Sequence, residues 1–258
     1  MHTTEEKLKA FERLLSIMDE LREKCPWDRV QTFDSLRNLT IEETYELADA
    51  IMDRHMEDIK KELGDLILHI VFYAKIGSET GDFDIADVIS SINQKLVFRH
   101  PHVFGDRKVR NAGEVIENWE EIKMKEGNRS VLSGVPVSLP ALIKSHRIQD
   151  KVRAVGFDWE KREEVWDKVI EEISEVKEEM SSAGNRERLE EEVGDLLFSI
   201  VNAARLYDIE PETALEKTNK KFIQRFRYLE KKAGESGKSL KEMSLQEMEV
   251  LWQEAKSV

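Results

Sequence analysis

Paired acidic residues at helical spacing are the feature of this sequence with the clearest chemistry. Glu43 and Glu46 are three residues apart, as are Glu62 and Asp65, so each pair shares one face of a helix. Two such helices side by side would aim four mutually repelling carboxylates at one point. A hard divalent cation relieves the repulsion, and all-oxygen ligation suits Mg²⁺ or Mn²⁺. Glu42 is left as a water-orienting base or an outer-shell ligand.

The same acidic pattern returns in the second half of the chain. The matching residues, at offsets of 129 or 130, are Glu171, Glu172, Glu175, Glu192 and Asp195. About one residue in five is acidic, and a lone acidic pattern of this kind is more often a solvated helix face. Other acids are not retained; Asp58, for example, is matched by Arg188. Retention of these particular positions after duplication therefore favours a metal site in each copy.

Glycine and histidine refine the metal hypothesis. Gly64 and Gly194 lie between the acids of the second pair, where glycine costs a helix about 1 kcal/mol relative to alanine. Close approach by a helix or a ligand explains them, and so does packing alone. His69 is matched by Ser199, and neither copy has the Glu-x-x-His pairing of helical di-iron proteins. These observations favour Mg²⁺ over redox iron, with His69 as a buried or hydrogen-bonded residue.

Polar residues that the two copies share follow the acids, at an offset of 126. They are Asn93, Lys95 and Arg99 in the first copy and Asn219, Lys221 and Arg225 in the second. Lysine and arginine four residues apart share a helix face and hold polyphosphates well. Ordinary surface salt bridges are the alternative. Beside a metal-carboxylate cluster, the polyphosphate interpretation is the stronger one.

Two tryptophans, each with a lysine four residues later, complete the repeated set. The residues are Trp119 with Lys123 and Trp252 with Lys256. An aromatic ring in this position either stacks on a nucleobase or fills a gap between helices. The sequence supports the two interpretations equally.

Long helices must position these residues. Glycine (12) and proline (5) are scarce, 36% of residues are charged and 40% are hydrophobic, which favours helices with a sizeable core over turn-rich sheets. Apolar residues at 41, 45, 48 and 52 follow helical periodicity. We predict an all-α fold of two tandem helical bundles from an internal duplication. The domains are 1–126 and 141–258, and a linker of glycine, proline and serine covers 127–140.

Charge and composition limit the partners. The net charge of −13 excludes an extended nucleic-acid groove, although a pocket for one phosphorylated small molecule is compatible with it. Cys25 is the only cysteine, so the chain has no intrachain disulfide. The polar start lacks the pattern of a signal peptide, and the longest apolar runs are about half of a membrane span. We expect a cytoplasmic protein that binds neither nucleic acid nor membrane.

The combined motifs resemble a known family. The acids are preceded by Cys25-Pro26-Trp27-Asp28 in the first copy and by Val155-Gly156-Phe157-Asp158-Trp159 in the second, with His100-Pro101-His102-Val103-Phe104-Gly105 between the copies. This arrangement resembles the MazG nucleoside triphosphate pyrophosphohydrolases, of the all-α NTP pyrophosphatase superfamily. The resemblance covers nearly the whole chain and includes both sets of acids.

The resemblance implies helical bundles that form a homodimer, with Mg²⁺ between the acid-bearing helices. It implies hydrolysis of ribo- and deoxyribonucleoside triphosphates to the monophosphate and pyrophosphate, in nucleotide-pool cleansing or alarmone control. The metal ligands of the family correspond to Glu43, Glu46, Glu62 and Asp65, and to Glu172, Glu175, Glu192 and Asp195. Its triphosphate contacts correspond to Lys95, Arg99, Lys221 and Arg225.

The expected reaction is attack of water on the α-phosphorus, with Glu42 or Glu171 orienting or deprotonating that water. Two alternatives belong to other classes. One is a non-catalytic helical interaction module with an acidic surface, and the other is a different metal-dependent phosphohydrolase. Whether one or both copies are catalytic is left open by the sequence, because each copy has the full set of acids.

Overall fold

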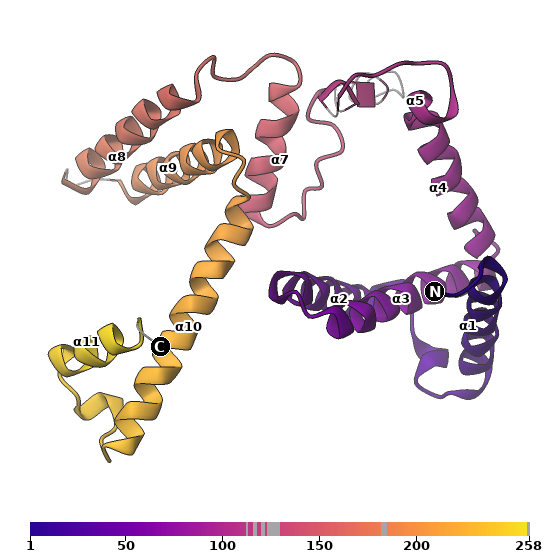
Figure 1. The fold of residues 1–258 in the computed structure, drawn as a ribbon, viewed down its shortest axis with the longest axis horizontal. Helices are drawn as coiled ribbons and strands as arrows, with labels where there is room; N and C mark the ends of the chain where they lie inside the picture. Colours follow the sequence, from indigo (N-terminus) through magenta and orange to yellow (C-terminus); the bar gives the residue numbers. More distant parts are fainter. Residues whose placement is uncertain (112, 116–117, 120–121, 123–129, 182–184, 257–258) are drawn as a thin grey trace. The chain divides into compact units, whose positions relative to one another are not determined.

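Helices and the loops that join them make up the part of the chain that the computed structural model describes (Figure 1). The described residues are 1–256 except 112, 116–117, 120–121, 123–129 and 182–184. No strand occurs among them, so the predicted all-α class is confirmed. The chain divides into two units, Met1–Arg110 and Asn111–Val258. The predicted linker, 127–140, falls within the second unit, and its role as the boundary between the copies stays a prediction.

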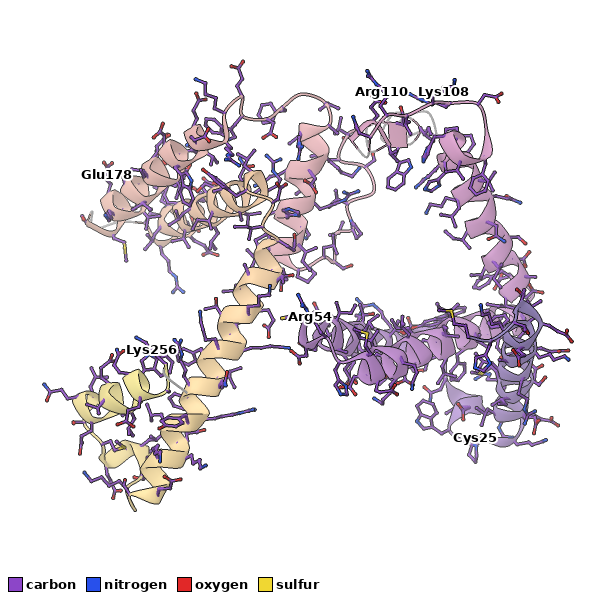
Figure 2. The ribbon with its side chains drawn as sticks, in the orientation of Figure 1. Cys25, Arg54, Lys108, Arg110, Glu178 and Lys256 are labelled. Atoms are coloured by element: carbon purple, nitrogen blue, oxygen red, sulfur yellow. The ribbon has the colours of Figure 1, made fainter. Side chains whose placement is uncertain are left out.

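The first unit is built around two antiparallel helices. Its elements are α1 (Thr4–Lys24), η1 (Asp28–Val30), α2 (Phe33–Asp53), α3 (Met56–Thr80), α4 (Ile85–Arg99) and α5 (Pro101–Phe104). Helices α2 and α3 pack along each other, and α1 packs on α3. Arg54 ends α2 in the left-handed conformation, with φ of 56°, which lets the chain reverse into α3 (Figure 2).

Local sequence signals start these helices. At α1, the Thr3 hydroxyl accepts a hydrogen bond from the Glu6 amide while the Glu6 carboxylate accepts one from the Thr3 amide. Thr32 and Ser35 make the same reciprocal pair at the start of α2. Such capping satisfies backbone donors that the first turn leaves unpaired.

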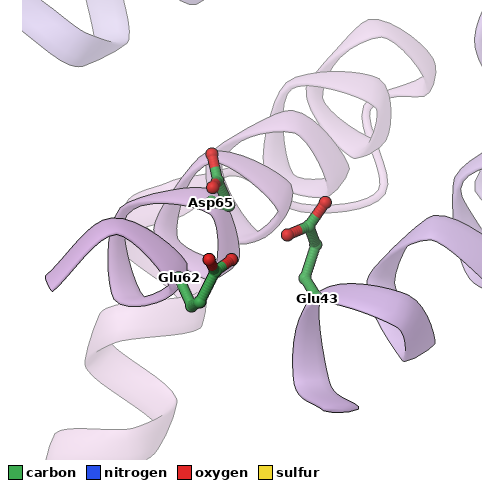
Figure 3. A group of neighbouring side chains, drawn as sticks. All are labelled: Glu43, Glu62 and Asp65. Carbon is green, nitrogen blue, oxygen red and sulfur yellow. The ribbon is translucent and has the colours of Figure 1, made fainter. Parts of the chain in front are cut away.

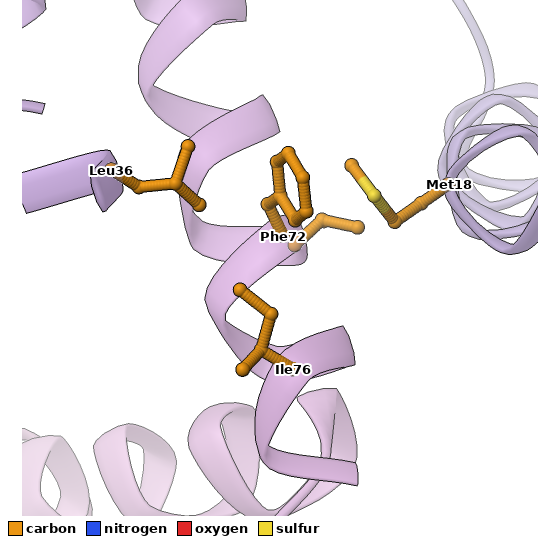
Figure 4. Close-up of a cluster of buried hydrophobic side chains, with 5 residues drawn as sticks. Met18, Leu36, Phe72 and Ile76 are labelled. Atoms are coloured by element: carbon orange, nitrogen blue, oxygen red, sulfur yellow. The ribbon is translucent and has the colours of Figure 1, made fainter. Parts of the chain in front are cut away.

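The core of the first unit lies where α1, α2 and α3 meet (Figure 4). Met18 from α1 and Leu36 from α2 are each 1% exposed. They meet Phe72 and Ile76 on α3, which are 3% and 7% exposed. Partly buried residues, including Leu39, pack around this cluster. Burial of these large apolar side chains is the main stabilising contribution of the three helices.

The second unit repeats the antiparallel pair with different surroundings. Its elements are α7 (Ala141–Arg153), η2 (Arg162–Glu164), α8 (Val165–Ser181), α9 (Arg186–Leu206), α10 (Pro211–Glu235), η3 (Leu240–Glu242) and α11 (Leu245–Glu254). Helices α8 and α9 correspond to α2 and α3, and α7 packs across α9. Val165, Val169 and Ala203 form the buried centre of this packing.

Helix α10 carries the end of the second unit away from the α8–α9 pair (Figure 1). It begins at Pro211 beside α7 and α9, and α11 folds back on its distal part. No helix among the described residues has the length and apolarity that a membrane crossing needs.

Candidate active site

The paired helices of the first unit bring three of the predicted acids together. Glu43 comes from α2, and Glu62 and Asp65 come from α3 (Figure 3). One carboxylate oxygen of each lies within 4.8 Å of the others. Glu62 is 5% exposed, and its Oε2 atom has no hydrogen-bond partner among the described residues. We call these three residues the N-terminal trio.

The electrostatics of the N-terminal trio reflect crowded negative charge. The pKa of Glu43 is raised by partial burial and by the charges of Asp65, Glu46 and Glu62. Lys61 partly compensates, with its Nζ atom 2.9 Å from Glu62 Oε1 and 4.0 Å from Asp65 Oδ2. Its hydrogen bond to Glu62 in turn raises the pKa of Lys61.

Helices α8 and α9 make an equivalent C-terminal trio of Glu172, Glu192 and Asp195. Their carboxylate oxygens again lie within 4.8 Å of one another. Glu172 is 4% exposed, and its Oε2 atom has no hydrogen-bond partner in the described part of the chain. The more buried carboxylate therefore belongs to the second acid-bearing helix in one unit and to the first in the other.

A lysine on the first helix compensates charge at the C-terminal trio. The Nζ atom of Lys168 lies 2.7 Å from Glu172 Oε1 and 2.9 Å from Glu171 Oε1. These hydrogen bonds raise the pKa of Lys168. Burial and the charges of Glu172 and Glu192 raise the pKa of Glu175. Lys168 on the first acid-bearing helix and Lys61 on the second thus each compensate negative charge at the trio of their own unit.

Both trios fit a hard divalent cation. Each offers oxygen ligands from two helices, and each contains a buried carboxylate oxygen that lacks a partner within the described chain. A buried, unpaired carboxylate oxygen is costly unless a cation or a donor meets it. The donor set contains no nitrogen or sulfur, which suits Mg²⁺ or Mn²⁺.

The remaining acids of the predicted set flank the trios. Glu46 lies on α2 and Glu175 on α8, outside the two groups whose oxygens converge within 4.8 Å. Both are near enough for electrostatic coupling, because Glu46 raises the pKa of Glu43 and Glu172 raises that of Glu175. Glu42 is exposed on α2, and Glu171 is exposed and paired with Lys168.

A cavity of about 820 Å³ opens beside the C-terminal trio. Its wall includes Glu172, Asp195 and Lys168, and it continues along α9 to Arg205. Helix α7 and the segment from Gly156 to Glu160 close the other sides. Sites for small molecules commonly have about 300–1,000 Å³.

The basic residues predicted in the first copy lie on another helix. Asn93, Lys95 and Arg99 all belong to α4, which follows the far end of α3. Asp65 is fifteen residues before the end of α3 at Thr80, or about 22 Å along the helix axis. Trp119 belongs to the second unit, and Lys123 lies outside the described residues.

The corresponding residues of the second copy gather on α10 and α11. The Arg225 guanidinium lies 5.9 Å from the centre of the Trp252 ring, and Phe222 packs against that ring at 5.0 Å. Lys221 is one turn before Arg225, and Asn219 hydrogen bonds to Glu216. Lys256 hydrogen bonds to Gln253, just beyond α11. Trp252 thus packs on α10 through Phe222 and Arg225, and this cluster lies along α10, away from the C-terminal trio.

Contacts within the described chain account for the histidine near the acids but not for the two glycines. A Cβ atom added at Gly64 or Gly194 would meet no atom of the described chain within 4 Å, so close packing within one chain does not explain either glycine. His69 is 8% exposed, and its Nδ1 atom lies 2.7 Å from the Thr40 hydroxyl. The prediction that His69 is a buried, hydrogen-bonded residue is confirmed.

Several residues that line the cavity are not among those predicted from the sequence, because that prediction rests on residues that the two copies share. Continuing the offsets of 129 and 130 residues pairs Lys168 with Leu39 and Asn202 with Phe72. Ile148 likewise pairs with Met18. Met18 and Phe72 are buried core residues of the first unit, and Leu39 packs against them, whereas their counterparts line the cavity. The differences between the copies were the signal that would have located it.

Comparison with known proteins agrees with this arrangement. The model of the MazG nucleotide pyrophosphohydrolase domain matches twice, at residues 31–104 and 160–229. The nucleoside triphosphate pyrophosphohydrolase of Escherichia coli K12 is 44% identical over 254 residues, which are 95% of this chain and 97% of that protein. The nucleoside triphosphate pyrophosphohydrolase/pyrophosphatase MazG of Thermotoga maritima is 44% identical over 251 residues, or 95% of each chain. YabN of Bacillus subtilis is 48% identical over 98% of this chain and 53% of its own length.

The double match confirms the tandem organisation, and each match contains one of the acidic trios. The chain belongs to the MazG nucleotide pyrophosphohydrolase family. It is a hydrolase of that class, in its two-domain form.

Proposed function

We propose that the chain hydrolyses ribo- and deoxyribonucleoside triphosphates to the monophosphate and pyrophosphate with Mg²⁺, or with Mn²⁺ in its place. The observation that carries this proposal is the cavity that opens directly beside the buried carboxylate of Glu172. A metal-binding carboxylate group and a chamber of ligand size at the same place suit a metal-dependent reaction of a small phosphorylated substrate.

Four carboxylates of the second unit would hold the cation: Glu172, Glu175, Glu192 and Asp195. When bound, it supplies charge neutralisation and Lewis acidity for attack at the α-phosphorus. Glu171 would accept the proton of the attacking water, and the hydrogen bond that it accepts from Lys168 fixes its carboxylate beside Glu172. Lys168 lines the cavity and would stabilise negative charge on the substrate.

We place the reaction in the second unit. The trio of the first unit, with Glu46 and the corresponding base Glu42, has the same donor chemistry. However, the residues of the first unit that correspond to the cavity wall include the buried Met18 and Phe72. A packed core at those positions leaves the first unit a structural role, in which its trio binds a cation without turnover.

A second copy of the chain would bring the triphosphate-binding residues to the site. Lys221, Arg225, Trp252 and Lys256 lie along α10 and α11, and the α8–α9 pair exposes large apolar side chains. These are Trp166, Ile170, Val193, Leu197 and Ile200, each 40% to 60% exposed. An apolar surface beside a charged site is typical of a protein interface. We therefore propose a homodimer in which each copy contributes to the site of the other, including Asn219.

The first copy offers a parallel set of polar and aromatic residues. Asn93, Lys95 and Arg99 lie on α4, and Trp119 and Lys123 follow in sequence. If the first unit is structural, these residues contribute to assembly or to substrate steering rather than to turnover. In the cell, the activity would serve nucleotide-pool cleansing or the control of alarmone levels.

Product analysis tests the proposed reaction. Purified protein is incubated with ATP or dATP and Mg²⁺, and the products are separated by anion exchange. We expect the nucleoside monophosphate and pyrophosphate in equal amounts, with loss of turnover in EDTA and recovery on adding Mg²⁺ or Mn²⁺. Nucleoside diphosphate with inorganic phosphate would indicate a different phosphohydrolase, and no turnover of any triphosphate would favour a non-catalytic interaction module.

A further inference from the structure

Two amide side chains that the carboxylate chemistry does not use also line the cavity. They are Gln149 on α7 and Asn202 on α9. The inference drawn from them rests on the proposed function, because it concerns how the same cavity recognises its nucleotide. Asp195 and Glu172 lie at one border, and the cavity continues along α9 through Ser199 and Asn202 to Arg205.

Gln149 presents an acceptor in a fixed orientation. The residue is 4% exposed, and its Nε2 atom donates to the backbone oxygen of Phe198 at 2.9 Å. Turning the amide over would place two oxygens against each other, so the donation to Phe198 fixes which atom faces which way. Its Oε1 atom is buried and has no hydrogen-bond partner among the described residues. A buried acceptor of this kind is destabilising unless a ligand or a water donates to it.

The amide of Asn202 is also fixed, but here the acceptor is occupied and the donor is left over. Its Oδ1 atom accepts hydrogen bonds from Arg205, at 3.1 Å from Nε and 2.8 Å from a terminal nitrogen. Arg205 is itself 4% exposed and donates to Asp158 at 3.1 Å. Because Oδ1 faces the guanidinium, the Nδ2 donor of Asn202 is directed away from Arg205.

The two amides lie at levels along α9 that a nucleoside reaches when its triphosphate is held at the acids. Phe198, which holds Gln149, is three residues beyond Asp195, and Asn202 is seven residues beyond it. At 1.5 Å per residue, these levels are about 4.5 and about 10.5 Å along α9 from the carboxylate. A nucleoside whose triphosphate is held at the acids extends into this part of the cavity, since the cavity continues along α9 from that border.

Aromatic surfaces accompany the amides. Phe157, Trp159 and Phe198 also line the cavity. Stacking on aromatic side chains favours any flat base, while amide groups select among bases by hydrogen bonding to their Watson–Crick edges.

We propose that Gln149 and Asn202 form a base-reading pair, in which Gln149 Oε1 accepts a hydrogen bond from an N–H group of the nucleobase. Asn202 donates to the neighbouring acceptor on the same edge. Adenine and cytosine place an exocyclic donor beside a ring acceptor, and guanine and uracil have the reverse order. A fixed acceptor and a fixed donor therefore distinguish these two classes of base, and Gln149 is a specificity-determining residue.

The first unit lacks this pair. Gln149 corresponds to Asp19, which forms an ion pair with Lys75 at 2.7 Å, and Asn202 corresponds to the buried Phe72. The acids are common to both units, whereas the polar pair occurs only at the cavity of the second. This distribution fits a role in recognising a ligand better than a role in holding the shared fold.

The test compares substrates on the wild-type chain and on Gln149→Met. Initial rates give kcat/KM for ATP, CTP, GTP, UTP and the 6-deamino analogue of ATP, which lacks the exocyclic amine. In the wild type we expect at least one class of base to exceed the other by about tenfold, the factor that one net hydrogen bond supplies. In Gln149→Met that ratio falls to within about twofold. Gln246→Met, on the exposed surface of α11, is the matched control and should keep the wild-type ratio.

A uniform fall in kcat/KM for all triphosphates in Gln149→Met would overturn the proposal, because it would mean a purely structural role. A change in the ratio of ATP to dATP with no change in the ratios among bases would also overturn it, since the sugar hydroxyl would then be the donor. The wild-type comparison does not depend on the variant folding. Equal rates on all five substrates there would contradict base reading while leaving triphosphate hydrolysis intact, and no turnover at all would instead count against the proposed function.

Discussion

The two units of the chain use the same pair of acid-bearing helices in different surroundings. In the first unit, Met18, Leu36 and Phe72 fill the space between α1, α2 and α3. In the second, the residues corresponding to Met18 and Phe72 are Ile148 and Asn202, and they border a cavity of about 820 Å³. The carboxylate trios are alike, so the units differ in the residues that surround the acids, which form a packed core in the first unit and border a cavity in the second.

The acids are thus shared by the two units, whereas the residues packed around them are not. Filling the space with Phe72 adds apolar burial, which stabilises the first unit. In the second unit, polar groups such as Gln149 and Asn202 line the cavity in place of that apolar burial. Under the proposed function, the first copy would contribute stability and the second would bind the substrate.

Filling the cavity should have a large effect on activity. Asn202→Phe gives the second unit the residue of the first, and we expect kcat/KM to fall about 100-fold because the nucleoside loses its space. Steady-state kinetics with ATP measures this loss. Asn202→Ala is the control, since it removes the hydrogen bonds to Arg205 and leaves the space open, and it should lose only about tenfold. Equal activity of Asn202→Phe and the wild type would show that substrate binds elsewhere.

The reverse change should affect stability instead. Phe72→Asn removes a buried aromatic ring and places an amide in the core, and we expect the free energy of unfolding of the first unit to fall by about 3–5 kcal/mol. Calorimetry of the full chain would show one transition moving to lower temperature, while kcat at 20 °C stays within about twofold. Phe72→Leu should cost less. Loss of turnover in Phe72→Asn below its transition would mean that the first unit takes part in catalysis.

The free energies of unfolding of the two units should respond differently to acid, because the units contain different ion pairs. In the second unit, burial raises the pKa of Asp158, but hydrogen bonds from Arg205 and from the Trp159 amide outweigh it and leave the pKa below its ordinary value of 3.8. A carboxyl group with a lowered pKa stabilises the fold above its unfolded-state pKa, and that stabilisation is lost as the pH falls through the folded-state pKa. Asp158→Asn should therefore lower the free energy of unfolding by about 2 kcal/mol at pH 7 and by less near pH 3, which is below the ordinary pKa of 3.8.

The first unit has a weaker counterpart in Arg22 and Glu79. The hydrogen bond from Arg22 lowers the pKa of Glu79, but the Glu79 side chain is 38% exposed, so solvent screens the pair. We expect Glu79→Gln to cost at most about 1 kcal/mol at pH 7. Urea unfolding of both variants at the two pH values checks the order. A larger loss for Glu79→Gln than for Asp158→Asn would reverse this part of the comparison.

Most of the fold could be predicted from the sequence because its signals are local and repeated. Helical periodicity, scarce glycine and proline, and the matched motifs are enough for an all-α fold in two copies, which the structure and the family matches confirm. Three acids of each predicted set converge, as spacing on two adjacent helices requires. Their roles as ligands, the dimer and the cytoplasmic location stay predictions.

The motifs that the copies share could not predict the cavity, because it depends on packing between helices that are far apart in sequence. Asn202 meets Arg205 locally, but Gln149 reaches Phe198 across 49 residues. Nothing in the pattern of shared acids shows that Leu39 is packed in a core while Lys168 faces a cavity. Likewise, the separation of α10 and α11 from the acids follows from the direction in which α10 leaves α9.

The central claim is that the second unit carries the reaction and the first does not. The most direct test measures pyrophosphate release from ATP with Mg²⁺ for Glu172→Gln and Glu43→Gln, made separately in the full chain. Losing a ligand that supplies several kcal/mol of transition-state stabilisation should slow Glu172→Gln by about 1,000-fold, while Glu43→Gln stays within about threefold of the wild type. A comparable loss in Glu43→Gln, or near-normal turnover in Glu172→Gln, would contradict the claim.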